Sequence, residues 1–222
     1  MLGILNRSGG YLSAPVALER PDVVKAIVSV DSATLMQPIS LYKDRASNAL
    51  GFDDPKERSK HMTAANSYGT VHIMDDWVEE SLKIEALPKY EEAAAKSVEL
   101  AGQFVRDLLT IKKDTHAWIR AGGLGCPTLV VSGLEDPSTV WDPIGLTCLN
   151  LILPNVDDAQ MHIFNHSGHY LFREHPEGFL GVVKAFIASS RKDWHLKGWN
   201  LSHSSCCLGA FGRSVVPSPA WY

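Results

Sequence analysis

The chain has 222 residues with 21 Lys and Arg against 25 Asp and Glu, giving a formal net charge of −4, and 45% of its residues are hydrophobic. This balance is typical of a globular protein of one large or two small domains, and it argues against a disordered or fibrous one. Basic residues are not clustered and no apolar run is long enough to cross a bilayer. We therefore expect neither nucleic acid nor membrane as a partner.

The N-terminus and the cysteines both favour a reducing compartment. The first residues have neither the basic segment nor the apolar core of a signal peptide. The four cysteines are spaced neither as a disulfide framework nor as a zinc site; they are Cys126, Cys148, Cys206 and Cys207. The sequence therefore predicts a cytoplasmic protein that needs no metal and no other cofactor, and it makes no prediction of oligomeric state.

Short apolar runs alternate with helical patterns over the first 190 residues, which predicts an α/β protein. The expected elements, in chain order, are a short strand before residue 6, a helix at 11–19, a strand at 26–30, a strand at 127–132, a helix at 143–153, a strand at 160–164 and a helix at 176–189. Because the strands are apolar without alternation, both of their faces should be covered, as in a parallel sheet.

The segment 36–123 interrupts this alternation because it is long, charged and helical in pattern. Within it, Val98, Ala101, Val105 and Leu108 are spaced to lie on one face of a single helix. A segment of this length is too long for a simple connection, so we expect a separate subdomain. Its apolar helix face is expected to cover the carboxyl edge of the sheet as a cap.

The C-terminal segment 191–222 differs from the rest, since it carries one acid, Asp193, but three of the six tryptophans. We interpret it as an irregular, disordered tail; a docking segment for a partner is the alternative. The expected domain organisation is thus an α/β core formed by 1–35 and 124–190, a helical cap at 36–123, and this tail.

Three polar segments follow predicted strands, at 6–10, 133–137 and 165–170. In parallel α/β sheets, the loops that leave the carboxyl ends of the strands converge on one crevice. The three segments supply Ser8, Asp136 and His169, which is the chain order of an acyl-transfer triad of the α/β-hydrolase type.

Each of these residues has a definite chemical role if the three meet. Ser8 would attack the substrate, His169 would accept the serine proton, and Asp136 would orient the imidazole and stabilise its charged form. The backbone N–H of Gly9, the residue after the nucleophile, would stabilise the oxyanion.

Three stretches resemble the α/β-hydrolase superfamily, at 17–31, 126–137 and 168–187. They are similar to the helix and strand after the nucleophile, the acid-bearing strand, and the histidine loop with the last helix. The most similar subgroup is the meta-cleavage-product hydrolases, which hydrolyse vinylogous diketones formed during aromatic-ring degradation. The resemblance implies a partial α/β-hydrolase fold, the C-terminal half of a mostly parallel sheet, with an inserted helical cap.

The function implied by this resemblance is serine-type hydrolysis of a small-molecule substrate, either an apolar ester or a vinylogous diketone whose C–C bond is cleaved. Asn6 and Tyr170 are expected to contact that substrate. Tyr170 stands where the C–C hydrolases usually show Trp, so an aromatic wall is retained.

The sequence departs from the family pattern near its start. Met1 lies just before the nucleophile turn, so the family's early strands are missing and the chain is expected to be N-terminally truncated. The Gly-x-Ser-x-Gly pattern fits in two registers, one with Arg7 in the nucleophile position and one with Ser8. Pro15 falls inside the next helix, where it removes a hydrogen bond. The alternative is therefore a catalytically inactive remnant that binds a ligand or is a non-functional fragment.

Overall fold

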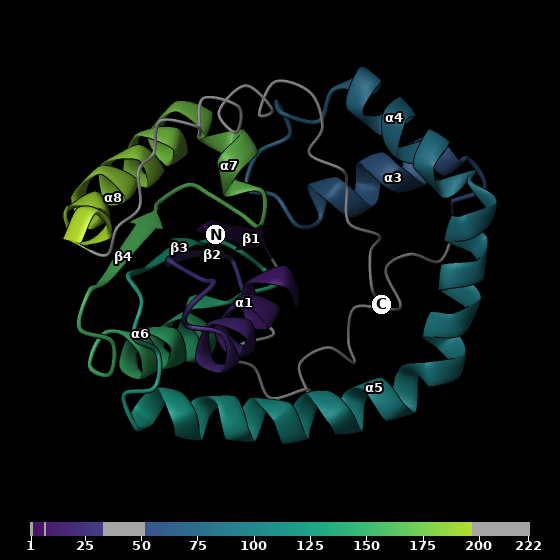
Figure 1. Cartoon of the computed structure of the whole chain (residues 1–222). Helices are drawn as coiled ribbons and strands as arrows, with labels where there is room; N and C mark the ends of the chain where they lie inside the picture. The colour runs from purple at the N-terminus through teal and green to yellow at the C-terminus, as the bar shows by residue number, and fades with distance from the viewer. Residues whose placement is uncertain (1, 7, 33–51, 197–222) are drawn as a thin grey trace.

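The computed structural model describes residues 2–6, 8–32 and 52–196, and its centre is a parallel sheet (Figure 1). The described strands follow the order β1-β2-β3-β4. Their bounds are Leu2–Asn6 for β1, Ala26–Val30 for β2, Thr128–Gly133 for β3 and Ala159–Phe164 for β4. The predicted parallel sheet is confirmed, and the two later strands begin within one residue of the expected positions.

The register brings the carboxyl ends of the strands to one edge. Asn6 pairs with Val30, Val30 pairs with Val131, and Gly133 pairs with Phe164. The residues of β2 and β3 are all buried, as expected for central strands rich in β-branched residues. Loops that leave this edge therefore start close to one another.

Some of the described helices flank this sheet, and others form an arc that extends to one side of it (Figure 1). The described helices are α1 (Ser8–Glu19), α3 (Pro55–Ala64), α4 (Asp75–Glu85), α5 (Pro88–Arg120), the short π-helical segment η3 (Trp141–Gly145) continuing into α6 (Leu146–Ile152), α7 (Leu171–Glu174) and α8 (Pro176–Leu196). The boundary expected at residue 190 falls inside α8, and residues 197–222 lie outside the described residues. None of the described helices combines the length and apolarity needed to cross a bilayer.

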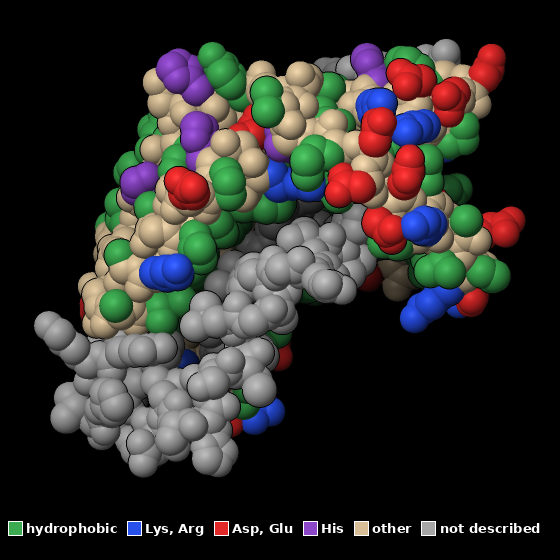
Figure 2. All heavy atoms as spheres, turned by 90° about the horizontal axis from the view of Figure 1, so that it is seen from above, with side chains coloured by type: hydrophobic (Ala, Val, Ile, Leu, Met, Phe, Trp, Pro, Cys, Tyr) green, Lys and Arg blue, Asp and Glu red, His purple; other side chains and the backbone are tan. Residues whose placement is uncertain are grey.

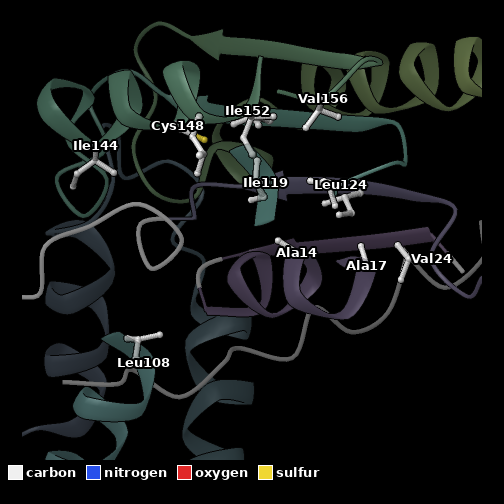
Figure 3. Close-up of a cluster of buried hydrophobic side chains, with 13 residues drawn as sticks. Ala14, Ala17, Val24, Leu108, Ile119, Leu124, Ile144, Cys148, Ile152 and Val156 are labelled. Carbon is white, nitrogen blue, oxygen red and sulfur yellow. The ribbon is translucent and has the colours of Figure 1, made fainter. Parts of the chain in front are cut away.

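Two apolar cores sandwich the sheet, so the architecture has three layers. One core joins Ile27 and Val130 of the sheet to α1, α6 and the C-terminal part of α5 (Figure 3). The other joins the opposite sides of β2 and β3 to α7 and α8, with Phe186 as its largest buried side chain. Since both central strands are covered on each face, the sheet edge that carries the candidate site is held on a rigid support.

Helix α1 contains Pro15 in its interior, as expected. The ring removes one backbone donor and typically costs about 3 kcal/mol inside a helix. The helix nevertheless runs from Ser8 to Glu19, because Ala14 and Ala17 bury one side of it against the first core. The helix starts directly after β1, three residues earlier than the expected helix.

The described part of the predicted cap is helical, but α5 does not pack as expected. Val98 is 81% exposed and Ala101 is exposed, whereas Leu108 is buried in the first core. Instead of covering the carboxyl edge of the sheet, α5 contacts α1 and α6 and reaches α4 at its other end. The expected position of this apolar face is therefore wrong. Part of the predicted cap, residues 36–51, lies outside the described residues.

Charged side chains gather where α3, α4 and the start of α5 lie (Figure 2). Lys60 contacts Asp75 at 2.9 Å, and Lys56 contacts Glu79 at 3.2 Å. These two acids in the first half of α4 are thus paired with lysines of α3, and because the pairs are exposed, solvent screens them and they add little to stability.

Candidate active site

The loops after β3 and β4 are joined along their length. We call residues 134–138 the acid loop and residues 165–170 the histidine loop. The N–H of Leu134 donates to the carbonyl of Phe164 at 2.9 Å. The N–H of Glu135 donates to the carbonyl of Ser167 at 3.0 Å, and the carboxylate of Glu135 accepts the N–H of Ser167 at 3.0 Å. These bonds fix the two loops relative to each other.

Gly133 shows how closely the two loops approach. A Cβ atom on Gly133 would overlap the carbonyl oxygen of Gly168 and would lie 2.5 Å from that of Ser167. Because both neighbours are backbone atoms, no larger residue fits here without moving the histidine loop. Glycine is therefore required for close approach.

The two loops bring Asp136 and His169 into direct contact. His169 Nδ1 lies 2.7 Å from Asp136 Oδ2, and each residue is 1% exposed. The other carboxylate oxygen of Asp136 accepts the N–H of Ser138 at 2.6 Å. Burial opposes ionisation of Asp136, but the charge and hydrogen bond of His169, together with the Ser138 N–H, hold the pKa of Asp136 below its usual value.

This contact sets the form of the imidazole. An ionised Asp136 accepts the proton on Nδ1, so neutral His169 carries its proton there and leaves Nε2 as an acceptor. Nε2 is buried and meets no hydrogen-bonding partner among the described residues. An unpartnered buried nitrogen costs about 1–3 kcal/mol, and Nε2 is the atom that the sequence predicts to accept the serine proton.

The nucleophile segment reaches the same sheet edge. Asn6 is the last residue of β1 and Ser8 the first residue of α1, and β1 is separated from the acid-bearing β3 by one strand. Arg7 lies outside the described residues. The choice between Arg7 and Ser8 as the residue in the nucleophile position, and the substrate contact of Asn6, stay predictions.

The start of α1 supplies an electropositive backbone. The first N–H groups of a helix have no intrahelical acceptor and lie at the positive end of the helix dipole. Gly9 is the second residue of α1. Its N–H is therefore suited to stabilise a developing oxyanion, which is the role that the sequence predicts for it.

The loop between α3 and α4 lies over both active-site loops. The carbonyl of Asn66 accepts the N–H of His169 at 2.7 Å. The side-chain oxygen of Asn66 accepts the Ser138 hydroxyl at 2.7 Å. Asn66 thus links the helical segment to the acid loop and the histidine loop at once. Sequence reasoning missed this residue, because nothing local marks an asparagine more than sixty positions before the loops it contacts.

Glu174 at the end of α7 ties the same parts together. Its carboxylate accepts the N–H groups of Tyr68 at 2.7 Å, Gly69 at 2.9 Å and Gly168 at 2.6 Å. A Cβ on Gly168 would lie 2.6 Å from the Tyr68 nitrogen, so the loops meet backbone to backbone. Sequence reasoning noted Glu174 only as part of a family resemblance and gave it no role.

We predict that Glu174→Gln loosens this junction. Glutamine has one side-chain oxygen and adds an N–H₂ that faces backbone donors, so at least one of the three bonds is lost. Hydrogen bonds to charged groups contribute about 1.5–3 kcal/mol each, so the free energy of unfolding should fall by about that amount. Urea denaturation measures this free energy of unfolding. Glu177→Gln, an exposed acid in the first turn of α8, is the matched control, and equal stability of the two variants would contradict the assignment.

Tyr170 forms an aromatic wall beside His169. The two rings meet edge to face at 5.6 Å between centroids. On its other sides Tyr170 meets His72 at 6.0 Å and Trp77 at 6.2 Å, and the Arg173 guanidinium stacks on Trp77 at 4.1 Å. Tyr170 thus joins the helical segment to the histidine, and its contact with substrate stays a prediction.

A third buried acid, Asp31, lies beside the pair. One carboxylate oxygen of Asp31, one of Asp136 and one ring nitrogen of His169 lie within 4.8 Å of one another. This spacing could also surround a metal ion. Because Nδ1 of His169 is hydrogen-bonded to Asp136 at 2.7 Å, we interpret Asp136 and His169 as an acid–base pair, with Asp31 beside it. The sequence analysis assigned no role to Asp31.

Comparisons with known proteins agree with this architecture. No family model matches the chain. Over 189 residues it is 28% identical to a 2-hydroxy-6-oxononadienedioate/2-hydroxy-6-oxononatrienedioate hydrolase of Cupriavidus pinatubonensis. This alignment covers 83% of this chain and 61% of that protein. It is 25% identical over 186 residues to a 2-hydroxymuconate semialdehyde hydrolase of Pseudomonas putida, with the same two shares.

Solved structures show the same fold. A crystal structure of a variant of the meta-cleavage product hydrolase CumD matches with a TM-score of 0.62 at 20% identity, over 84% of this chain and 64% of that one. The chain therefore has the α/β-hydrolase fold, and its curated relatives are meta-cleavage product hydrolases. It spans about three fifths of the length of these relatives.

Proposed function

We propose that the chain is a serine-type hydrolase that cleaves a C–C bond in a small vinylogous diketone. The observation that carries the proposal is the buried Asp136–His169 contact at the carboxyl edge of the sheet. The relatives named as hydrolases of 2-hydroxy-6-oxo dienoates support the substrate class. A small apolar ester, which the same machinery can attack, is the second substrate class.

The proposed reaction proceeds in two halves. The Ser8 oxygen attacks the substrate carbonyl while its proton passes to Nε2 of His169, and Asp136 stabilises the imidazolium that forms. The Gly9 N–H stabilises the oxyanion. The C–C bond then breaks, and its electron pair stays on the leaving carbon, which takes the proton from His169. Water, deprotonated by His169, hydrolyses the remaining acyl–Ser8 ester.

Covalent labelling tests the nucleophile. A fluorophosphonate probe is expected to label the protein at one site, and the Ser8→Ala variant should lose the label, because only a serine activated by a base reacts at an appreciable rate. The Ser97→Ala variant, which removes a partly exposed serine on α5, should label like the unchanged protein.

The outcome also separates the enzyme from the alternative. A folded protein that takes no label, or whose label survives in Ser8→Ala, would contradict the proposal. The first of these results would favour the inactive, ligand-binding remnant, with Arg7 in the nucleophile position.

A further inference from the structure

Asp31 is held firmly at the end of β2. It is fully buried, and its backbone φ is 42°, in the left-handed region that residues other than glycine rarely adopt. Its N–H donates to the carbonyl of Val131 at 3.0 Å, and its side-chain Oδ1 accepts the N–H of Gly133 at 2.9 Å. Its carbonyl accepts the Thr139 hydroxyl at 3.3 Å. Strained backbone of this kind is concentrated at functional sites.

The side chain of Asp31 faces the catalytic pair. A carboxyl oxygen of Asp31 lies within 4.8 Å of ligand atoms of both Asp136 and His169. Its Oδ2 is buried and has no hydrogen-bonding partner among the described residues. Two carboxyl groups and one imidazole therefore occupy one buried cluster, and the proposed function uses only one of the carboxyls.

These charges cannot all be present together. Two carboxylates at this separation repel strongly in a buried site, so one of them must hold a proton. Asp136 accepts the Nδ1 proton of His169 and the N–H of Ser138, so Asp136 is the ionised one. Burial and the Asp136 charge raise the pKa of Asp31 well above its usual value; the Gly133 N–H opposes this, and Glu174 adds to it.

We propose that Asp31 is a positioning residue of this site, a protonated carboxylic acid that anchors Gly133 at the base of the acid loop and leaves Asp136 as the single negative charge in contact with His169. This inference rests on the proposed function of the pair. A second negative charge would hold the imidazolium too firmly and would hinder transfer of its proton to the leaving carbon.

Carbon NMR of the unchanged protein tests the protonation state without any substrate. With ¹³C-labelled aspartate, one side-chain carboxyl resonance is expected to keep the chemical shift of a neutral acid at pH 7, and Asp31→Asn should remove that resonance. Asp22→Asn, at an exposed acid paired with Arg20, is the control and should leave it in place. If every aspartate resonance shows the ionised shift at pH 7, the proposal is overturned.

The carbon NMR readout leaves the role of Ser8 untouched, so failure here and failure of labelling are distinguishable.

Activity completes the assignment. The Asp31→Asn variant should retain kcat within about threefold and an unchanged pH–rate profile, whereas Asp31→Ala, which leaves the Gly133 N–H without its acceptor, should lose about tenfold. Equal losses in the two variants would contradict a positioning role that asparagine can fulfil.

Discussion

Replacing Asp136 with asparagine is expected to lower kcat for the proposed hydrolysis by about 10⁴-fold while the fold is retained. Asparagine has nearly the shape of aspartate but lacks its charge. It can present its N–H₂ group to Nδ1 of His169, which would then carry no proton, and the proton would move to Nε2. Nε2 would no longer accept the proton of Ser8, so the wrong tautomer would dominate.

The measurement is steady-state turnover of a chromogenic ester and of a 2-hydroxy-6-oxo dienoate. The Asp157→Asn variant, at an exposed acid before β4, is the control and should turn over like the unchanged protein. If Asp136→Asn keeps kcat within tenfold, the Asp136–His169 contact has no catalytic role. Circular dichroism of the two variants should be identical, because a loss of fold would mimic a loss of chemistry.

The sequence was sufficient to predict the sheet and the pair because both depend on local patterns. Strands rich in β-branched residues, such as Ala26–Val30, are recognisable without any knowledge of their neighbours. A parallel sheet then places the ends of β3 and β4 side by side, so Asp136 and His169, each a few residues past a strand, had to lie close together.

What the sequence did not predict depends on contacts between distant segments. Asn66 and Glu174 form hydrogen bonds to the histidine loop. These contacts depend on the fold of the α3–α4 loop, for which the sequence carries no local signal. The apolar stripe on α5 indicated a helix correctly, but it did not indicate which surface the helix would meet. No role was predicted for Asp31, because its burial beside a second acid is a property of the assembled sheet edge.

The free energy of unfolding is expected to depend on pH in opposite directions through the two buried acids, Asp31 and Asp136. For Asp31 the folded-state pKa lies above the unfolded value. The folded protein therefore keeps a proton that the unfolded chain releases, and the stabilisation is complete below the unfolded pKa near 3.8 and is lost as pH rises toward the folded pKa. In that window the loss is up to about 1.4 kcal/mol per pH unit.

The Asp31→Asn variant does not titrate and escapes this loss. Its free energy of unfolding relative to the unchanged protein should increase steadily from pH 4 to pH 7, as measured by urea denaturation at several pH values. Asp136 has the opposite dependence, because its folded-state pKa is lowered. Its stabilisation is present above the unfolded pKa and is lost as pH falls through the folded value, so Asp136→Asn should be most harmful at neutral pH.

The exposed control Asp22→Asn should show no comparable pH trend, because solvent screens the charge of Asp22. A constant difference between Asp31→Asn and the unchanged protein over the whole range would mean that Asp31 has the same charge in the folded and unfolded chains. A difference that grows with pH would require a proton bound only in the folded state. Because this readout needs neither substrate nor an intact nucleophile, it tests the electrostatics of the cluster even if Arg7, and not Ser8, occupies the nucleophile position.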